Sequence, residues 1–200
     1  MKRTNNTIGL FSLRLFLLPG EETTLHINEL RYLQLITECF DKDICFGIPY
    51  QGKTTLTEFG SIVRVRRIVK TYDNGELDIL IECVQNFKLK HYEGKVEGKL
   101  YPGGSIIPLR SIEHTPNSLL TRSINKYLNI LHGDEFFSSF EDGLTIPIIV
   151  KMLQLSDEEK LRFIKITEEK RQNDFLLRKT KFITILLEQE KLVEENFYLN

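Results

Sequence analysis

The pattern of apolar and polar positions divides the chain into a strand-rich first half and a helical second half. In the first half, β-prone runs bounded by turn residues predict strands over residues 8–18, 23–27, 44–50, 62–72 and 77–89. One early helix is expected to begin at Asn28 or Glu29, where a polar or acidic side chain can cap free N–H groups, and to end at Asp41-Lys42-Asp43. Its apolar positions share one face at helical spacing: Tyr32, Leu35, Ile36, Cys39 and Phe40.

The two longest predicted strands are joined by Asp73-Asn74-Gly75, which predicts a hairpin. Asn-Gly favours a type I′ turn, because both central residues tolerate positive φ. If Asn74-Gly75 is a two-residue loop, Arg67 lies opposite Glu82 and Val69 lies opposite Leu80.

Helices are predicted throughout the second half. Thr115 suits an N-cap and Pro116 the first helical position, with Gly133 as the stop. The apolar stripe of this helix is Leu120, Ile124, Tyr127, Leu128 and Leu131. The chain is therefore expected to divide into a β subdomain over residues 1–114 and a helical subdomain over residues 115–200.

Three further helices are expected towards the C-terminus. Residues 145–155 form one if Pro147 lies in its first turn. Ser156 and Glu159 have the spacing of a capping box that opens a second. Asn173 or Asp174 opens the last, whose apolar residues are expected to face one way: Phe175, Phe182, Ile183, Leu186 and Leu187.

Composition limits the class of protein. The 200 residues are 41% hydrophobic, which is enough to bury a core without disulfides or metals. The net charge of −1 provides no overall attraction to nucleic acid or anionic lipid. The three cysteines, Cys39, Cys45 and Cys83, contain no CxxC pair, so we expect reduced thiols in a cytoplasmic protein.

The N-terminal sequence has some features of a secretion signal. Lys2 and Arg3 precede an apolar run over residues 10–18, but Arg14 interrupts the run and Glu21 follows it without a small-residue cleavage site. A strand explains the stretch better. No segment approaches the roughly 18 apolar residues that a membrane span requires.

One stretch imitates a nucleotide-binding loop. Residues 47–54, Gly-Ile-Pro-Tyr-Gln-Gly-Lys-Thr, match the P-loop pattern GxxxxGK[ST]. A P-loop needs a helix after the loop, whereas the residues after Thr54 are β-prone and lack helical periodicity. The four histidines have no metal-site spacing, and no nucleophile elbow occurs. We therefore expect no catalytic residues, no cofactor and no metal, and a nucleotide-dependent enzyme remains only the third hypothesis.

One basic cluster occurs on the strand at 62–72. Arg64, Arg66 and Lys70 share a face and Arg67 points the opposite way. With the hairpin register above, the cross-strand neighbours of the first three are Gln85, Cys83 and Ile79, none of them acidic. The cluster is consistent with a site for RNA or for acidic or extended peptide. The favoured interpretation is a solubilising face, or one that pairs with the Glu-rich helices, because such patches are common on neutral proteins.

A series of short motifs resembles the N-terminal domain of Lon proteases. The first is the Pro19-Gly20 turn, followed by Leu25, Ile27, Glu29, Arg31 and Tyr32. Further motifs are Phe46-Gly47-Ile48, the strand after Gly60, the Asn74-Gly75 turn, the pair Glu82 and Phe87, and the run from Leu153 to Lys160. The chain departs from the family pattern at Asn28, Leu30, Cys83 and Asn86.

The resemblance implies an α+β fold, a PUA-like β pseudo-barrel with one early helix followed by a C-terminal helical bundle. The two subdomains would together form one Lon N-terminal-type domain. The resemblance also implies a recognition domain without the ATPase and serine–lysine peptidase modules, as in free-standing bacterial cytosolic proteins of this type. We expect no enzymatic activity from such a domain.

The leading functional hypothesis is a non-catalytic module that binds unfolded or extended polypeptide, or a protein partner such as a separate protease or ATPase. Binding would use apolar docking beside the sheet or pairing with an exposed strand edge. The candidate partner-binding residues are Tyr50, Arg64, Arg66 and Phe87. The alternative is an RNA-binding PUA-like module that uses the Arg64, Arg66 and Lys70 face, against which the neutral net charge argues.

Overall fold

A computed structural model describes residues 7–52, 55–132 and 143–198. The chain forms two compact units, Met1–Ser111 and Ile112–Asn200. The expected subdomain boundary at 114/115 falls shortly after this division. None of the helices within the described ranges is long and apolar enough to cross a membrane.

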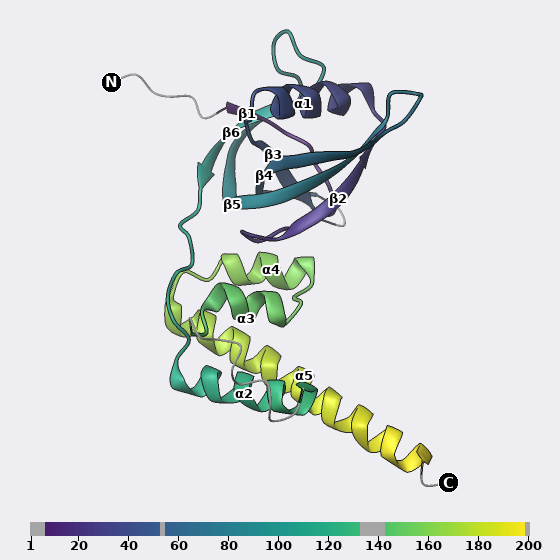
Figure 1. Ribbon diagram of the computed structural model, residues 1–200. Coiled ribbons are helices and arrows are strands. Elements are labelled where there is room, and N and C mark those ends of the chain that lie inside the picture. Colours follow the sequence, from purple (N-terminus) through teal and green to yellow (C-terminus); the bar gives the residue numbers. More distant parts are fainter. Residues whose placement is uncertain (1–6, 53–54, 133–142, 199–200) are drawn as a thin grey trace. The chain divides into compact units, whose positions relative to one another are not determined.

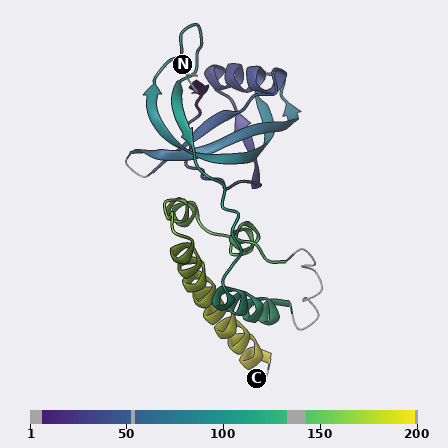
Figure 2. The same ribbon diagram turned by 90° about the vertical axis from the view of Figure 1, so that its left-hand side faces the viewer.

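Within the described residues, the first unit is a curled antiparallel sheet with one helix (Figure 1). Its elements are β1 (Thr7–Gly9), β2 (Glu22–Ile27), α1 (Leu30–Asp41), β3 (Phe46–Gln51), β4 (Leu56–Thr71), β5 (Leu77–Glu93) and β6 (Gly103–Pro108). The strand order is β1-β6-β5-β4-β3, and β2 pairs with the first part of β5. Figure 2 shows the strands curling around, with α1 lying against the sheet. This arrangement confirms the α+β class with a partly closed β barrel.

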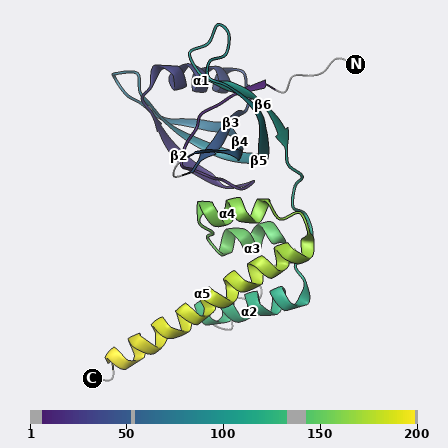
Figure 3. The same cartoon turned by 180° about the vertical axis from the view of Figure 1, so that it is seen from behind.

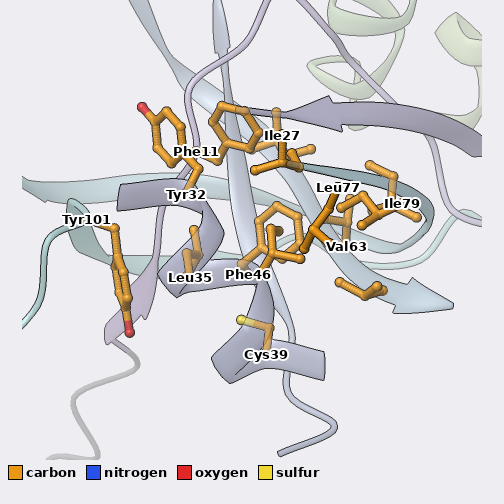
Figure 4. Close-up of a cluster of buried hydrophobic side chains, with 14 of the residues drawn as sticks. Phe11, Ile27, Tyr32, Leu35, Cys39, Phe46, Val63, Leu77, Ile79 and Tyr101 are labelled. Carbon is orange, nitrogen blue, oxygen red and sulfur yellow. The ribbon is translucent and has the colours of Figure 1, made fainter. Parts of the chain in front are cut away.

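The main core lies between α1 and the sheet. Figure 4 shows side chains of α1 facing residues of the strands. The cluster includes Ile27, Tyr32, Leu35, Ile36, Cys39, Phe46, Val63, Ile79 and Ile81. Of the face predicted for α1, only Phe40 is exposed. The helix ends where expected: Asp43 has a φ of +48°, its N–H donates to Phe40 O, and the N–H of Ile44 donates to Cys39 O. This is a Schellman motif with aspartate in the position where glycine is usual.

The predicted first strand is mostly irregular, which corrects that expectation. Only Thr7–Gly9 pairs in β1, and isolated parallel bridges join Leu10 to Gly47 and Leu13 to Tyr50. The run is apolar without alternation, and it passes from β6 to β3 instead of continuing along one neighbour. Its main chain is therefore satisfied by several different elements.

The predicted register of the β4–β5 hairpin is wrong. Glu82 lies opposite Arg64, and Arg67 lies opposite Leu80. Only Gly75 in the turn has positive φ, at +85°, so the type I′ geometry is not formed. Tyr72 N–H donates to Glu76 O and its carbonyl accepts from Gly75, which gives a three-residue loop. Three β-bulges farther along β4 shift the register again.

The described part of the second unit contains four helices. They are α2 (Ser118–His132), α3 (Ile146–Met152), α4 (Asp157–Ile164) and α5 (Glu169–Tyr198). In α2 the cap is Asn117 rather than Thr115, since its Oδ1 accepts from Leu120 N–H at 2.9 Å. Pro147 lies in the first turn of α3 as expected, and the Ser156–Glu159 capping box is confirmed. The predicted stop at Gly133 lies outside the described residues.

The last helix differs from the prediction in its start and in its buried face. It begins at Glu169, and Asn173 accepts a hydrogen bond from the N–H of Asn117 at 2.8 Å instead of capping its own helix. Figures 1 and 3 show α2 lying alongside α5, whose last turns extend past the end of α2. The buried positions of α5 are Gln172, Asn173, Leu176, Thr180 and Thr184, whereas the predicted members Phe182 and Leu186 are exposed.

Candidate functional site

The candidate site is the outer edge of β4 from Arg64 to Thr71. The first part of β4 lies between β3 and β5, but the pairing with β3 ends at Val63. Beyond it, no strand within the described ranges pairs with the side of β4 that faces away from β5. The main chain here presents hydrogen-bonding groups that an added strand could use. We call Arg64–Thr71 the β4 edge.

Side chains along the β4 edge are unusually accessible. Residues 66–70 are all exposed, although a regular strand would turn every second side chain inward. Two β-bulges interrupt the alternation in this stretch, between Val65 and Arg67 and between Ile68 and Lys70. Ile68 and Val69 are 36% and 43% exposed and lie between cationic side chains. The edge thus combines apolar and basic contacts.

Acidic groups accompany these cations, which corrects the predicted charge imbalance. Arg64 Nε lies 3.6 Å from Asp43 Oδ1. Arg66 Nε lies 3.3 Å from Glu82 Oε2. Lys70 lies opposite Asp78 in the register, and its Nζ lies 4.1 Å above the Tyr72 ring. For Glu82 and Asp78 the error follows from the register, because the three-residue loop and the bulges bring these acidic residues to positions where neutral ones were expected.

Two of the four candidate partner-binding residues belong to the core instead. Phe87 is fully buried and Tyr50 is 6% exposed, packing edge-to-face on Phe16 with ring centroids 5.9 Å apart. Phe87 occupies the space beside Gly60, where a Cβ would lie 2.5 Å from its ring. Neither aromatic side chain offers a surface to a partner in this fold. Arg64 is half-buried and Arg66 is exposed, and both lie on the β4 edge.

A polar cluster lies at the hairpin end of the same strands. His26 Nδ1 is 2.8 Å from Asp78 Oδ1 and His26 Nε2 is 3.1 Å from Glu76 Oε2. Tyr72 donates its hydroxyl to Asp78 Oδ2 at 2.7 Å. The hydrogen bond with Asp78 raises the pKa of His26 above its usual 6.5, and the hydrogen bonds from Tyr72 and then His26 lower the pKa of Asp78. These contacts link β2 to the β4–β5 hairpin. Sequence reasoning missed the cluster because His26 is far in the chain from the other three members.

The P-loop look-alike lacks the required geometry. Its first residues form β3, Gly52 N–H donates to Thr55 O at 3.0 Å in a turn, and β4 follows where a P-loop has a helix. Lys53 and Thr54 lie outside the described residues. The described part of the chain also contains no group of three side chains arranged to hold a metal ion.

The motif at residues 19–32 has a structural explanation. Gly20 turns the chain with a φ of +82°, and its N–H donates to Cys83 O at 2.8 Å. Leu25 and Ile27 follow in β2. Glu29 occupies the N-cap position of α1 and accepts from Arg31 Nε at 2.8 Å.

The end of the motif supports this helix start. The guanidinium of Arg31 lies 4.5 Å above the ring of the buried Tyr32. Together with the pairing of Arg31 to Glu29, this contact orients the first turn of α1. In the later motif formed by Glu82 and Phe87, Glu82 pairs with Arg66 and Phe87 is a core residue.

Comparison with known proteins identifies the class. Residues 7–184 match the family of the ATP-dependent protease La (LON) substrate-binding domain, and the chain belongs to this family. The family describes the substrate-binding part of the protease, which is not a catalytic domain. A search of curated protein sequences found no match.

Solved structures show the same fold. The Lon N-terminal domain protein from Xanthomonas campestris is 18% identical, covers 86% of this chain and 97% of its own, and superposes with a TM-score of 0.66. The N-terminal domain of the Mycobacterium avium complex Lon protease is 11% identical, with coverages of 88% and 98% and a TM-score of 0.64.

Proposed function

We propose that this domain binds extended segments of polypeptide by strand addition along the β4 edge. The observation that carries the proposal is the run of six successive exposed residues, 66–71, on a strand whose outer side is unpaired within the described structure. Main-chain pairing supplies affinity without requiring a particular sequence, which suits a binder of unfolded chains.

The side chains of the β4 edge define the preferred ligand. Ile68 and Val69 provide apolar contacts, and Arg66, Arg67 and Lys70 provide cationic ones. Extended peptides that carry both apolar and acidic residues fit this combination. Because Arg66 already pairs with Glu82, charge contributes mainly to selectivity and the apolar and main-chain contacts supply most of the affinity.

The RNA alternative is less favoured by this geometry. It proposed contact with phosphates through the face of Arg64, Arg66 and Lys70, and Asp43, Glu82 and Asp78 lie beside that face. Carboxylates at this distance oppose contact with phosphate. RNA binding is therefore kept only as an outcome of the experiment below.

The test is fluorescence anisotropy with a labelled, permanently unfolded polypeptide and, in parallel, a labelled single-stranded RNA, each at low and high salt. Saturable binding of the polypeptide that persists at high salt is expected. Salt-sensitive binding of RNA alone would overturn the proposal.

A matched pair of variants locates the site. Ile68→Lys with Val69→Lys should weaken polypeptide binding about tenfold or more, by removing the apolar contacts of the edge. Val84→Lys is the control, because Val84 is also an exposed valine of the sheet, 40% accessible, but lies on β5. Equal binding by both variants would show that the β4 edge is not the site.

The same proposal gives the protein a place in ATP-dependent proteolysis or protein quality control in the cytoplasm. A binder of extended chains would deliver them to an ATPase or protease. Stable recovery of such an enzyme with the domain, dependent on added unfolded polypeptide, would support this role. Recovery that is unchanged by Ile68→Lys with Val69→Lys would argue against delivery through the β4 edge.

A further inference from the structure

The second half of α5 carries apolar residues on the face opposite its buried one. The buried side of the helix consists of Leu176, Thr180 and Thr184, and it packs with α2. On the other side, five large apolar side chains are exposed among those that the structure describes. Leu192 is one of them, at 59%, and the other four are Phe182, Ile185, Leu186 and Val193, with exposed fractions of 58%, 53%, 42% and 57%. We call these four residues the α5 stripe.

The spacing of the α5 stripe is that of a helix-pairing seam. Steps of three, four and seven residues keep side chains on one face of a helix. Ile185 and Leu186 lie three and four residues after Phe182, and Val193 lies seven residues after Leu186. A row of large apolar residues on a solvent-facing helix marks an interaction surface more often than a scattered single residue does. The stripe is therefore suited to packing against a second helix.

The charge distribution along α5 identifies that partner. Residues 169–182 contain five cations and two anions, whereas residues 183–198 contain one cation and four anions. Two such helices in parallel would place like charges together. Two in antiparallel orientation place each cationic half beside an anionic half, with the α5 stripe in the middle.

Part of this charge is already paired within the unit. Lys179 bonds to Glu159 at 2.7 Å and Lys126 to Glu188 at 2.9 Å. Arg178 and Lys181 in the first half and Glu190 in the second half are exposed. They leave opposite signs available at the two ends of the stripe.

We propose that two copies of this chain associate through antiparallel contact of their α5 helices, with the α5 stripes buried between them. This inference does not depend on peptide binding at the β4 edge. The alternatives, a heterologous partner or a chain without a partner at the stripe, are outcomes of the test.

The first experiment is sedimentation velocity of the full chain over a range of micromolar concentrations. A concentration-dependent monomer–dimer equilibrium is expected, and Phe182→Glu with Ile185→Glu should raise the dissociation constant at least about tenfold. Leu119→Glu is the matched control, because Leu119 is an apolar residue of α2 that is 63% exposed, and it should leave the equilibrium unchanged. A monomer at all concentrations, or a dimer indifferent to the double variant, would overturn the proposal.

The charge argument provides a second variant that preserves the apolar residues. Arg178→Glu with Lys181→Glu makes the cationic half anionic, and it should weaken the dimer in a salt-dependent manner. If Phe182→Glu with Ile185→Glu fails to fold, as judged by its helix content, the charge variant tests dimer formation in its place. An unchanged dissociation constant would contradict the charge complementarity.

The relative orientation of the two α5 helices is tested by zero-length carbodiimide cross-linking of a mixture of unlabelled chains and chains labelled with nitrogen-15. Mixed-isotope peptides that join lysines of residues 169–182 to glutamates of residues 183–198 are expected from an antiparallel pair. Mixed-isotope links only between equivalent regions of α5 would show a parallel pair and overturn the inference.

Discussion

The hydroxyl of Ser61 makes two hydrogen bonds to the main chain of Leu17, accepting from its N–H at 3.0 Å and donating to its carbonyl oxygen at 2.7 Å. Both residues are buried. The side-chain amide of Asn86 donates to the same carbonyl at 2.7 Å. At Leu17, these side chains take the place of the neighbouring strand that the irregular segment lacks.

Ser61→Ala should therefore destabilise the domain. Asn86 would still satisfy the carbonyl of Leu17, but the buried N–H would lose its acceptor, at a cost of about 1–3 kcal/mol. The measurement is urea unfolding of the first unit, with Ser111→Ala as an exposed serine control. Equal stability of the two variants would mean that water replaces the hydroxyl.

Gly60→Ala should be more harmful than most glycine substitutions. A Cβ at Gly60 would lie 2.4 Å from Ile48 O and 2.5 Å from the ring of Phe87. Because backbone and a packed ring must both move, we expect a loss of about 3 kcal/mol or more. Gly94→Ala is the control, because its Cβ would meet no atom within 4 Å. Similar thermal midpoints for both variants would contradict the packing account.

The sequence predicts an element well where that element depends only on residues close together in the chain. The buried face of α1 and the capping box at Ser156 both follow from short-range spacing. The register of β4 and β5 does not, because it depends on bulges and on which turn residue adopts positive φ. One bulge changes every cross-strand neighbour beyond it.

Tertiary packing decides the rest. Periodicity alone does not determine which face of α5 packs against α2. The face that carries Thr180 and Thr184 is buried, whereas Phe182 is exposed. The same limit applies to the candidate site. Its cations at Arg64 and Arg66 were visible in the sequence, but the positions of Asp43 and Glu82 beside them required the fold.

Asp43 allows a direct test of the α1 terminus. Its φ of +48° is costly for most side chains but not for glycine. Asp43→Gly and Asp43→Ala both remove the exposed carboxylate near Arg64, so they share that effect. We expect the glycine variant to be more stable than the alanine variant by about 1 kcal/mol. Chemical unfolding of both proteins measures this difference, and a more stable alanine variant would contradict the left-handed geometry.

The His26–Asp78 contact predicts a pH-dependent contribution to stability. The pKa of His26 is raised, so its protonation stabilises the fold fully below 6.5, and this contribution is lost as the pH rises through the folded-state value. The pKa of Asp78 is lowered from 3.8, so its contribution is lost as the pH falls through its folded-state value. The contact should therefore stabilise the protein most between these limits.

The variant that measures this effect is His26→Gln. Its free energy of unfolding should differ from that of the unmodified protein most at a pH of about 5.5, and the difference should shrink towards pH 8.5. His91→Gln serves as the control because His91 is an exposed histidine of β5. A constant difference across this range would show that protonation of His26 is not linked to folding.

Glu159 links α4 to α5 and should contribute more than its neighbours to the helical unit. Its carboxylate accepts from Ser156 N–H and from Lys179 Nζ, at 2.8 and 2.7 Å. Partial burial acts to raise the pKa of Glu159, but these hydrogen bonds outweigh it and the pKa lies below 4.5. The contribution is thus present above that value and is lost as the pH falls through the folded-state pKa.

Replacing this carboxylate should therefore open the helix junction. Glu159→Gln should cost about 1–2 kcal/mol near neutral pH, because a charge-assisted bond and half of the capping box are weakened. Glu158→Gln, one position away and exposed, is the control. Hydrogen exchange of the α4 and α5 amides measures the loss, and a double-mutant cycle with Lys179→Met separates the pair from the cap. Additive effects in that cycle would mean that the cap alone accounts for the stabilisation by Glu159.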